Sequence, residues 1–287
     1  MLRIAMPNKG RLYDDLRDLL EAAGLPIRSP GERALRATLG DAFEALFVRA
    51  QDVPEFVADG AADAGITGLD QVLESGRDLV DRLDLGFGRC RLVLAVREES
   101  AVSALEDIPE GARVATTYPL LTQQAFAQAG KRVQVVPVSG AVEITPHLGI
   151  ADVIVDLVST GSTLRVNHLR EVSTLIESTC RLIAAPAGAL DAPRSAALAR
   201  LEAVLGSVIA ARGKRYLMAN VPRAQLEQVK QVLPGLSGPT VVDVLNGGAM
   251  VAVHAVVPSQ GLDTVISALK ALGGNGILVT RIERLVP

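Results

Sequence analysis

ADVIVDLVSTGSTL, residues 151–164, begins as an apolar run and ends in a turn of hydroxyls and glycine. The run has the hydrophobicity of a buried strand, and Thr160-Gly161-Ser162-Thr163 stands where a helix is predicted to begin. Backbone N–H groups and hydroxyls at a helix N-terminus favour an anion, because the helix dipole places partial positive charge there. The stretch therefore predicts a strand-turn-helix unit of an α/β fold, with a turn that binds phosphate.

Two carboxylates accompany this turn. Asp152 opens the predicted strand and Asp156 lies near its end. Carboxylates accept hydrogen bonds from sugar hydroxyls, so a phosphorylated sugar fits the stretch better than free phosphate, and a phosphoribosyl group is the natural candidate. Small-residue turns also cap helices in many α/β proteins without binding a ligand, and the turn alone leaves that alternative open.

The composition describes a globular chain of two or three domains, with 287 residues, 49% of them hydrophobic and 21% charged. The net charge of −3, without a basic run, predicts no nucleic-acid binding. The opening MLRIAMPNKGR is broken by charge and proline, which predicts neither a signal peptide nor a membrane span. Only Cys90 and Cys180 are present, too few for a disulfide framework, so we predict a cytoplasmic protein.

Strands and helices are predicted to alternate along residues 1–211. Residues 2–6 form a strand, and a helix follows with apolar positions up to Gly24. Further strands are predicted at 46–49, 64–66, 91–96, 113–115, 133–136 and 153–155, with helices at 53–60, after Pro119, near 142–148 and at 191–211. This rhythm is typical of a mainly parallel sheet.

The pattern changes near residue 213. Strands are predicted at 216–221, 240–245, 250–257 and 276–282, helices at 224–233 and 262–272, and a turn at 247–248. The resulting βαββαβ order is that of the split ferredoxin-like arrangement. We therefore predict a separate small domain.

A basic loop, Asn8-Lys9-Gly10-Arg11, follows the first strand. Open α/β sheets bind ligands at the carboxyl ends of their strands, and there Arg holds phosphate oxygens by a fork and Lys as a point charge. Arg49 has a similar position after the second strand, although such an arginine is more often in a surface ion pair. The loop predicts a site for pyrophosphate or triphosphate, with a solvated surface turn as the alternative.

Neither covalent catalysis nor zinc chemistry is indicated. His147, His168 and His254 are scattered without zinc-ligand spacing. Ser159 and Ser162 have no partnered His and Asp motif that would make either a nucleophile. The sequence therefore predicts a binding site rather than a covalent catalyst.

The spacing around the phosphate turn resembles a known signature. It consists of Glu143, Gly149, Ala151, Ile154, Asp156, Leu157, Thr160, Gly161, Thr163 and Leu164, and is similar to that of the ATP phosphoribosyltransferases, which open histidine biosynthesis. With the basic loop, the FGRC segment at 87–90 and the terminal domain, the resemblance covers nearly the whole chain and indicates the long form. It implies transfer of the phosphoribosyl group of phosphoribosyl pyrophosphate to N1 of ATP, releasing pyrophosphate.

The family resemblance also implies an architecture. It is an α/β fold of two periplasmic-binding-protein-like lobes forming a catalytic cleft, with a C-terminal ferredoxin-like, ACT-like regulatory domain. In this sequence we place the first lobe at residues 1–90 with 185–212, the second lobe with the phosphoribosyl-binding loop at 91–184, and the regulatory domain at 213–287.

The resemblance assigns roles to particular residues. Catalysis falls to Lys9, Arg11 and Arg49; phosphoribosyl pyrophosphate binding to Glu143, Asp152, Asp156, Ser159, Thr160, Gly161, Ser162 and Thr163; and ATP binding to Gly10, Asp70 and Tyr118. Glu143 is equally well explained as a plain helix-start carboxylate, and Tyr118 as a half-buried turn tyrosine. Magnesium is expected to arrive with the substrate pyrophosphate, without a dedicated protein ligand.

Regulation by histidine is a further implication of the resemblance. The residues that correspond to the family's effector site are Asn220, Leu236, Gly238 and Thr240. Asn220 stands where an aspartate can occur and Gly238 where a serine often does, which leaves the strength of inhibition open. The family's long form also implies a homo-oligomer, a hexamer that exchanges with dimers, with no membrane or nucleic-acid partner.

Two other functions fit parts of the pattern. A periplasmic-binding-like sensor of small molecules also has two α/β lobes around a cleft, but would bind a ligand without turnover. A different phosphoribosyltransferase would accept a free base in place of ATP. Formation of the N1-phosphoribosyl adduct separates both from the main prediction.

Overall fold

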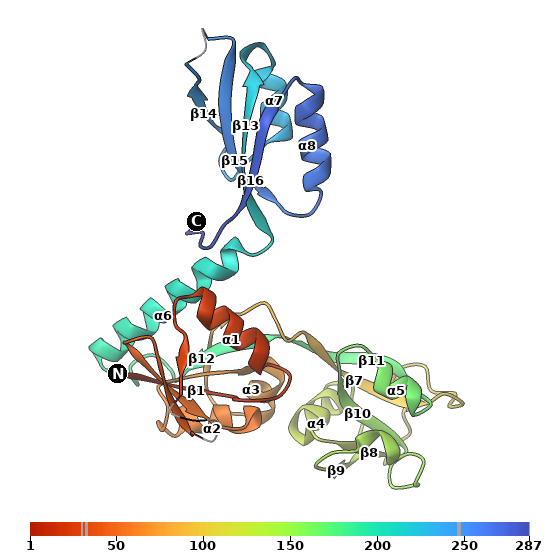
Figure 1. The fold of residues 1–287 in the computed structure, drawn as a ribbon. Coiled ribbons are helices and arrows are strands. Elements are labelled where there is room, and N and C mark those ends of the chain that lie inside the picture. The colour runs from red at the N-terminus through yellow and green to blue at the C-terminus, as the bar shows by residue number, and fades with distance from the viewer. Residues whose placement is uncertain (30, 32–33, 246–247, 287) are drawn as a thin grey trace. The chain divides into compact units, whose positions relative to one another are not determined.

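The computed structural model describes residues 1–29, 31, 34–245 and 248–286, which form two compact units, Met1–Leu205 and Gly206–Pro287 (Figure 1). The predicted turn at 247–248 lies partly outside the described residues. The unit boundary falls before the predicted domain start at 213, because one helix continues across it. No helix in the described ranges is long and apolar enough to cross a membrane.

The first sheet, as far as the structure describes it, has seven strands in the order β2-β3-β4-β1-β5-β12-β6. Its strands are Ile27–Arg28 (β2), Arg36–Leu39 (β3), Phe43–Phe47 (β4), Leu2–Met6 (β1), Ala64–Gly68 (β5), Cys180–Ala184 (β12) and Val80–Asp84 (β6). Parallel pairing joins β4 to β1 and β1 to β5, so the carboxyl ends of these three strands share one edge. The other pairs are antiparallel, so the sheet is mixed rather than mainly parallel.

Helices α1 (Tyr13–Ala22), α2 (Val53–Ala58) and α3 (Leu69–Ser75) accompany the first sheet. The predicted apolar face of α1 is confirmed, because Leu16, Leu19 and Leu20 are fully buried. Gly24 follows the helix in a left-handed conformation, with φ of 71°, and its N–H donates to the carbonyl of Glu21. That backbone conformation is the one glycine adopts without steric cost after a helix.

The second sheet, again within the described residues, has five strands in the order β11-β7-β10-β8-β9. They are Leu169–Ser178 (β11), Cys90–Arg97 (β7), Val153–Val158 (β10), Arg113–Thr116 (β8) and Gln134–Pro137 (β9), accompanied by α4 (Pro119–Gln128) and α5 (Ser162–Val166). Strands β10, β8 and β9 are parallel and end at one edge. The predicted helix near 142–148 is wrong: a 3₁₀ turn, Val142–Ile144, stands there, because Pro146 interrupts helical hydrogen bonding.

The chain passes twice between the two sheets, and the second passage corrects the predicted lobe boundary. Residues 180–184 were placed in the second lobe, but β12 inserts between β5 and β6 of the first sheet. The passages are hydrogen bonded to each other: the N–H of Leu85 donates to the carbonyl of Cys180, and the N–H of Cys180 to that of Phe87, each at 2.9 Å. The two lobes are thus joined by a paired, rather than a loose, connection.

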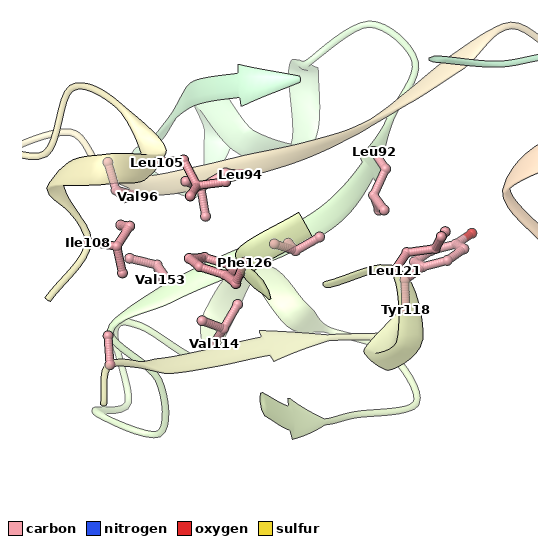
Figure 2. Close-up of a cluster of buried hydrophobic side chains, with 12 residues drawn as sticks. Leu92, Leu94, Val96, Leu105, Ile108, Val114, Tyr118, Leu121, Phe126 and Val153 are labelled. Atoms are coloured by element: carbon pink, nitrogen blue, oxygen red, sulfur yellow. The ribbon is translucent and has the colours of Figure 1, made fainter. Parts of the chain in front are cut away.

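A dense apolar cluster fills one side of the second sheet. Figure 2 shows Phe126 of α4 in its centre, with Leu94, Val114 and Val153 of the sheet around it and Tyr118 at its border. The ring of Phe126 is almost completely inaccessible, at 1% exposure. This core holds the start of α4, and therefore Tyr118, in a fixed position.

Replacing Phe126 with Ala is expected to destabilise the first unit by about 3–5 kcal/mol, because it leaves a cavity as well as removing buried apolar surface. The free energy of unfolding from urea denaturation checks this. Phe56→Ala is the matched control, since Phe56 is 37% exposed, and a similar loss in both variants would contradict the central position of Phe126.

The long helix α6 (Ala192–Ala211) confirms the helix predicted at 191–211. Its N-terminal part is tied to the first lobe by ion pairs from Arg194 Nη1 to Asp63 Oδ1, at 3.0 Å, and from Arg82 Nη2 to Glu202 Oε2, also at 3.0 Å. Leu201 and Leu205 on this helix are fully buried. The predicted assignment of the helix start to the first lobe thus has a physical basis in these contacts.

The second unit has the predicted βαββαβ order. Its elements are β13 (Lys214–Pro222), α7 (Leu226–Val232), β14 (Thr240–Asp243), β15 (Met250–Pro258), α8 (Leu262–Ala271) and β16 (Asn275–Arg281). The antiparallel strand order β14-β15-β13-β16 is ferredoxin-like. Both helices lie on one face of this sheet, over Leu217, Val221 and Val253, and Figure 1 shows them on the same side.

Candidate active site

The predicted phosphate turn lines a cavity of about 170 Å³. Gly161 adopts a left-handed conformation, with φ of 75°, which bends the chain from β10 into α5. The hydroxyls of Thr160 and Ser162 are 3.0 Å apart, and the N–H groups of Gly161 and Thr163 have no acceptor among the described residues. All five predicted turn residues line this cavity, namely Ser159, Thr160, Gly161, Ser162 and Thr163.

The helix after this turn is short. Helix α5 covers only Ser162–Val166, so few peptide dipoles are aligned toward the cavity. The donors available to an anion are therefore the hydroxyls and backbone N–H groups of the turn itself. This concave arrangement of donors is the kind that binds phosphate oxygens.

Two carboxylates, Glu143 and Asp156, border the same cavity. Burial raises the pKa of Asp156 to about 6; the N–H of Leu157, which donates to Asp156 Oδ1 at 2.8 Å, opposes the shift, and repulsion from Glu143 adds to it. Burial keeps water away from these carboxylates, and the hydroxyl groups of a ligand would donate hydrogen bonds to them in place of water. The cavity thus combines donors for a phosphate with acceptors for a diol.

Asp152, predicted for the same site, lies elsewhere. It precedes β10, four extended residues or about 13 Å from Asp156, at the opposite edge of the sheet from the turn. Its carboxylate binds Arg113, with 2.7 Å between Asp152 Oδ1 and Arg113 Nη2, and this guanidinium lowers the pKa of Asp152. Asp152 therefore serves an exposed structural ion pair and does not line the cavity.

The predicted basic residues follow parallel strands of the first sheet. Lys9 and Arg11 come after β1 and Arg49 after β4, so all three lie at the shared carboxyl edge. In the described part of the chain, the side chains of Lys9 and Arg49 are exposed and have no protein partner. Gly10 has a φ of 86°, a turn conformation that suits glycine.

Arg11 differs from the other two cations, because its Nη1 donates to the carbonyl of Gly88. Gly88 belongs to the FGRC segment that leads from one sheet to the other. The guanidinium therefore also fixes this passage, and only its remaining N–H groups are available to a ligand.

Asp70 and Tyr118, predicted to bind ATP, bind each other across the two lobes. The hydroxyl of Tyr118 donates to Asp70 Oδ2 at 2.8 Å, and Ser178 Oγ donates to Asp70 Oδ1 at 2.6 Å. The N–H of Asp70 returns a bond to Ser178 Oγ at 3.1 Å, and Asp70 is only 1% exposed. Burial, reinforced by the Asp70 charge, raises the pKa of Tyr118, so its hydroxyl stays protonated and remains a donor.

A second cavity, of about 510 Å³, lies where the lobes meet. From the first lobe it is lined by Gln51, Glu55, Gln71, Glu74 and Ser75, and from the second by Thr117, Tyr118, Pro119, Val138 and Ser139. Sequence reasoning missed all of these except Tyr118. The spacing of Gln71 and Glu74 after Asp70 could have indicated one helix face, but their contacts with the second lobe depend on tertiary structure.

The predicted effector residues lie in the second unit. Asn220 is on β13 and Thr240 opens β14, on the sheet face opposite the helices, while Leu236 and Gly238 are in the exposed loop before β14. Strand β15 separates Asn220 from Thr240, since His254 pairs with both Met218 and Thr240. The structure brings Asn220 and Thr240 to one face but not into direct contact.

These features define a class: a two-lobed α/β protein with a cavity at a small-residue turn that is lined by anion-binding donors and by carboxylates, followed by a ferredoxin-like domain. A family model described as ATP phosphoribosyltransferase matches residues 49–205, and one described as the C-terminal domain of HisG matches residues 211–284. The chain therefore belongs to the ATP phosphoribosyltransferase family, in its long form.

Individual relatives agree with the family models. An ATP phosphoribosyltransferase of Gemmatimonas aurantiaca is 62% identical, and one of Natronomonas pharaonis 52% identical, each over 100% of both chains. Among solved structures, the ATP phosphoribosyl transferase (HisG:HisZ) complex from Thermotoga maritima contains a chain that is 30% identical, with a TM-score of 0.63. That match covers 73% of this chain and 99% of the other.

Family membership establishes the reaction. The enzyme transfers the phosphoribosyl group of phosphoribosyl pyrophosphate to N1 of ATP and releases pyrophosphate, the first step of histidine biosynthesis. The predicted α/β fold class and this activity are both confirmed, and a sensor without turnover is not favoured.

Proposed function

We propose that the turn Ser159–Thr163, together with Glu143 and Asp156, forms the binding site for the phosphoribosyl donor. The supporting observation is that one cavity is lined both by hydroxyl and N–H donors and by two carboxylates. The donors suit the 5′-phosphate, whereas the carboxylates suit the 2′- and 3′-hydroxyls of the ribose. Asp152, bound to Arg113, is left out of this site.

Lys9 and Arg49 are proposed to stabilise the negative charge of the departing pyrophosphate. Both are cations without a protein partner in the described residues, at the carboxyl edge of the first sheet. Arg11 contributes mainly by fixing the FGRC passage through Gly88. Gly10 supports the loop by its backbone conformation, and Asp70 and Tyr118 shape the nucleotide site through their mutual hydrogen bond.

The reaction needs alignment and charge stabilisation more than a base. The lone pair of N1 attacks the anomeric carbon while the bond to pyrophosphate breaks, and N1 carries no proton that must be removed. Binding both substrates in line therefore supplies much of the rate enhancement, and the cations supply the electrostatic part.

Magnesium is proposed to enter as a complex with phosphoribosyl pyrophosphate. The carboxylates of Glu143 and Asp156 border the donor cavity, and carboxylate together with phosphate oxygens is the environment that Mg²⁺ prefers. The residues present thus fit a magnesium-bound donor. When bound, the ion neutralises charge on the leaving pyrophosphate.

One assay tests the proposed function of the site. Purified protein is incubated with ATP, phosphoribosyl pyrophosphate and Mg²⁺, and the N1-phosphoribosyl adduct is followed, with and without chelator. The adduct is expected in the wild type, and Thr160→Val is expected to weaken binding of phosphoribosyl pyrophosphate with an unchanged thermal melt. A variant with wild-type kinetics would remove the turn from the site.

Lys9→Ala is expected to lower kcat/KM by about tenfold or more, because removing a cation that contacts a charged group costs about 1.5–3 kcal/mol. Arg17→Ala is the matched control, since it removes one exposed charge from α1 in an ion pair with Asp14. Steady-state kinetics at fixed ionic strength compare them. Equal losses in the two variants would show that net charge, rather than the position of Lys9, matters.

We infer that the second unit senses histidine and that the enzyme is a cytoplasmic homo-oligomer, a hexamer exchanging with dimers. The support is the ferredoxin-like domain, matched as the HisG C-terminal domain, with Asn220, Leu236, Gly238 and Thr240 as the proposed effector residues. Sedimentation velocity with and without histidine tests the assembly.

Ending the chain after Arg212 is expected to abolish inhibition by histidine, because the proposed effector residues are all removed. Initial rates across a histidine titration measure this, compared with the full chain. Inhibition that survived in an active truncated protein would place the effector site in the first unit.

A further inference from the structure

The second cavity lies beside the donor cavity on one edge of the second sheet. The donor cavity follows β10, whereas Thr117 and Tyr118 follow β8 and Val138 follows β9. These strands are parallel neighbours in the order β10-β8-β9, and adjacent strands are about 4.8 Å apart. A group held in the second cavity can therefore reach an anomeric carbon held in the first.

Half of the polar side chains that line the second cavity, those of Glu55, Glu74, Ser75 and Tyr118, are already bound to protein partners. The carboxylate of Glu74 accepts the N–H groups of Leu120 and Leu121, each at 2.9 Å, and thus caps α4. Glu55 binds Arg77, and the hydroxyl of Tyr118 binds Asp70. Among the described residues that line the cavity, the groups left for a ligand are the amides of Gln51 and Gln71 and the hydroxyls of Thr117 and Ser139.

The amide of Gln71 differs from the others because its orientation is fixed. Gln71 Nε2 donates to Asp70 Oδ2 at 2.9 Å and to the hydroxyl of Tyr118 at 2.7 Å. An ionised carboxylate only accepts hydrogen bonds, and the Tyr118 proton is directed to Asp70, so both contacts require the nitrogen of the amide. The carbonyl oxygen, Gln71 Oε1, has no partner in the described part of the chain and is left as a preorganised acceptor in the cavity.

We propose that the second cavity holds the six-membered ring of ATP's adenine and that Gln71 Oε1 accepts a hydrogen bond from its 6-amino group. This rests on the proposed position of the donor in the neighbouring cavity. As the N1 lone pair forms its bond to the anomeric carbon and the electrons of the breaking bond leave with pyrophosphate, positive charge is shared between N1 and the 6-amino nitrogen. That amino group becomes a stronger donor, so a fixed acceptor stabilises the transition state more than the ground state.

The same acceptor makes Gln71 a specificity-determining residue. A base without the 6-amino group leaves the Gln71 carbonyl unpaired in a partly buried cavity, and an unpaired group is costly. The network of Asp70, Tyr118 and Ser178 is then the support that orients Gln71, which explains why the polar atoms of Asp70 and Tyr118 are bound to protein rather than free.

The experiment compares binding of ATP with that of purine riboside 5′-triphosphate, which has hydrogen in place of the amino group. Dissociation constants are measured by calorimetry for the wild type, Gln71→Met and Gln51→Met. In the wild type, ATP is expected to bind about tenfold more tightly. Gln71→Met should reduce this ratio to about twofold or less, whereas Gln51→Met should retain it.

Comparing the same two nucleotides in every protein cancels intrinsic differences between the bases. A merely structural effect of Gln71→Met would weaken both nucleotides equally and leave the ratio unchanged, which would overturn the proposal. If Gln51→Met, rather than Gln71→Met, abolished the preference for ATP, the amide of Gln51 would be the group that recognises the 6-amino group, and the proposal for Gln71 would be wrong. If Gln71→Met does not fold, equal dissociation constants of the two nucleotides for the wild type are sufficient to refute the proposal.

The donor site is tested separately. Binding of the two nucleotides is measured without phosphoribosyl pyrophosphate, whereas the turn variants are tested by binding of that donor. A wild type that forms adduct but does not distinguish the 6-position would contradict only the role of Gln71.

Discussion

Replacing Asp156 with Asn is expected to lower kcat/KM for phosphoribosyl pyrophosphate by about 100-fold and, at the same time, to make the free enzyme more stable. The activity loss follows from the proposed role of Asp156, because a charged acceptor for ribose hydroxyls is replaced by a neutral amide, and hydrogen bonds to charged groups contribute about 1.5–3 kcal/mol each. Steady-state kinetics and urea unfolding of one preparation measure both effects.

The stability gain follows from the sign of the pKa shift. Burial raises the pKa of Asp156 to about 6 in the folded protein, above the value of about 3.9 in an unfolded chain. Protonated Asp156 therefore makes its full contribution to the free energy of unfolding below about pH 4, and this contribution is lost as the pH rises through about 6. Above that pH, ionised Asp156 costs about 2–3 kcal/mol, and Asn removes part of this cost.

The same titration predicts a pH dependence of activity. Below about pH 6, Asp156 takes up a proton and loses its charge, so wild-type kcat/KM for phosphoribosyl pyrophosphate should fall toward acid pH. The residual activity of Asp156→Asn should not show this fall toward acid pH. Its persistence in the variant would assign the titration to another group.

Asp152→Asn is the matched control for both effects, because it makes the same chemical change at the other end of β10. Asp152 is exposed and bound to Arg113, whose charge lowers the pKa of Asp152. Activity should remain within about twofold of the wild type, and stability should fall by less than about 1 kcal/mol, as for other exposed ion pairs. A large activity loss here would return Asp152 to the donor site.

Replacing Asp70 with Asn is expected to destabilise the first unit by about 3 kcal/mol. Asp70 is fully buried and its carboxylate accepts hydrogen bonds from Ser178, Tyr118 and Gln71. An amide replaces one acceptor oxygen by a donor, so at least one buried donor faces another donor and loses its partner. Two of the three partners come from other segments of the chain, so the variant also weakens the contact of α3 with Tyr118 and Ser178.

Urea unfolding of Asp70→Asn measures this loss, and Tyr118→Phe is the graded comparison. Removing the Tyr118 hydroxyl deletes one donor and keeps the ring in its apolar cluster (Figure 2), so the cost should be about 1–1.5 kcal/mol. If Tyr118→Phe proves as costly as Asp70→Asn, Asp70 is not the centre of the network.

Several elements could be predicted because their cause is local. The apolar face of α1, the turn at Thr160–Thr163 and the βαββαβ order of the second unit follow from hydrophobic periodicity and turn residues within short windows. The helix expected near 142–148 failed for an equally local reason, since Pro146 opposes it. The basic residues at the ends of β1 and β4 were predictable once parallel pairing was assumed.

The sequence by itself determined that this chain has a hydroxyl-rich turn after a strand, a basic loop and a ferredoxin-like terminal domain, since each is encoded within one continuous segment. Only the tertiary structure decided which carboxylate faces the cavity, because Asp152 precedes β10 whereas Asp156 lies near the carboxyl end of that strand, beside the turn. It also decided that Asp70 and Tyr118, 48 positions apart, bind each other. Contacts between distant segments depend on how the two sheets are joined, and no local pattern specifies that.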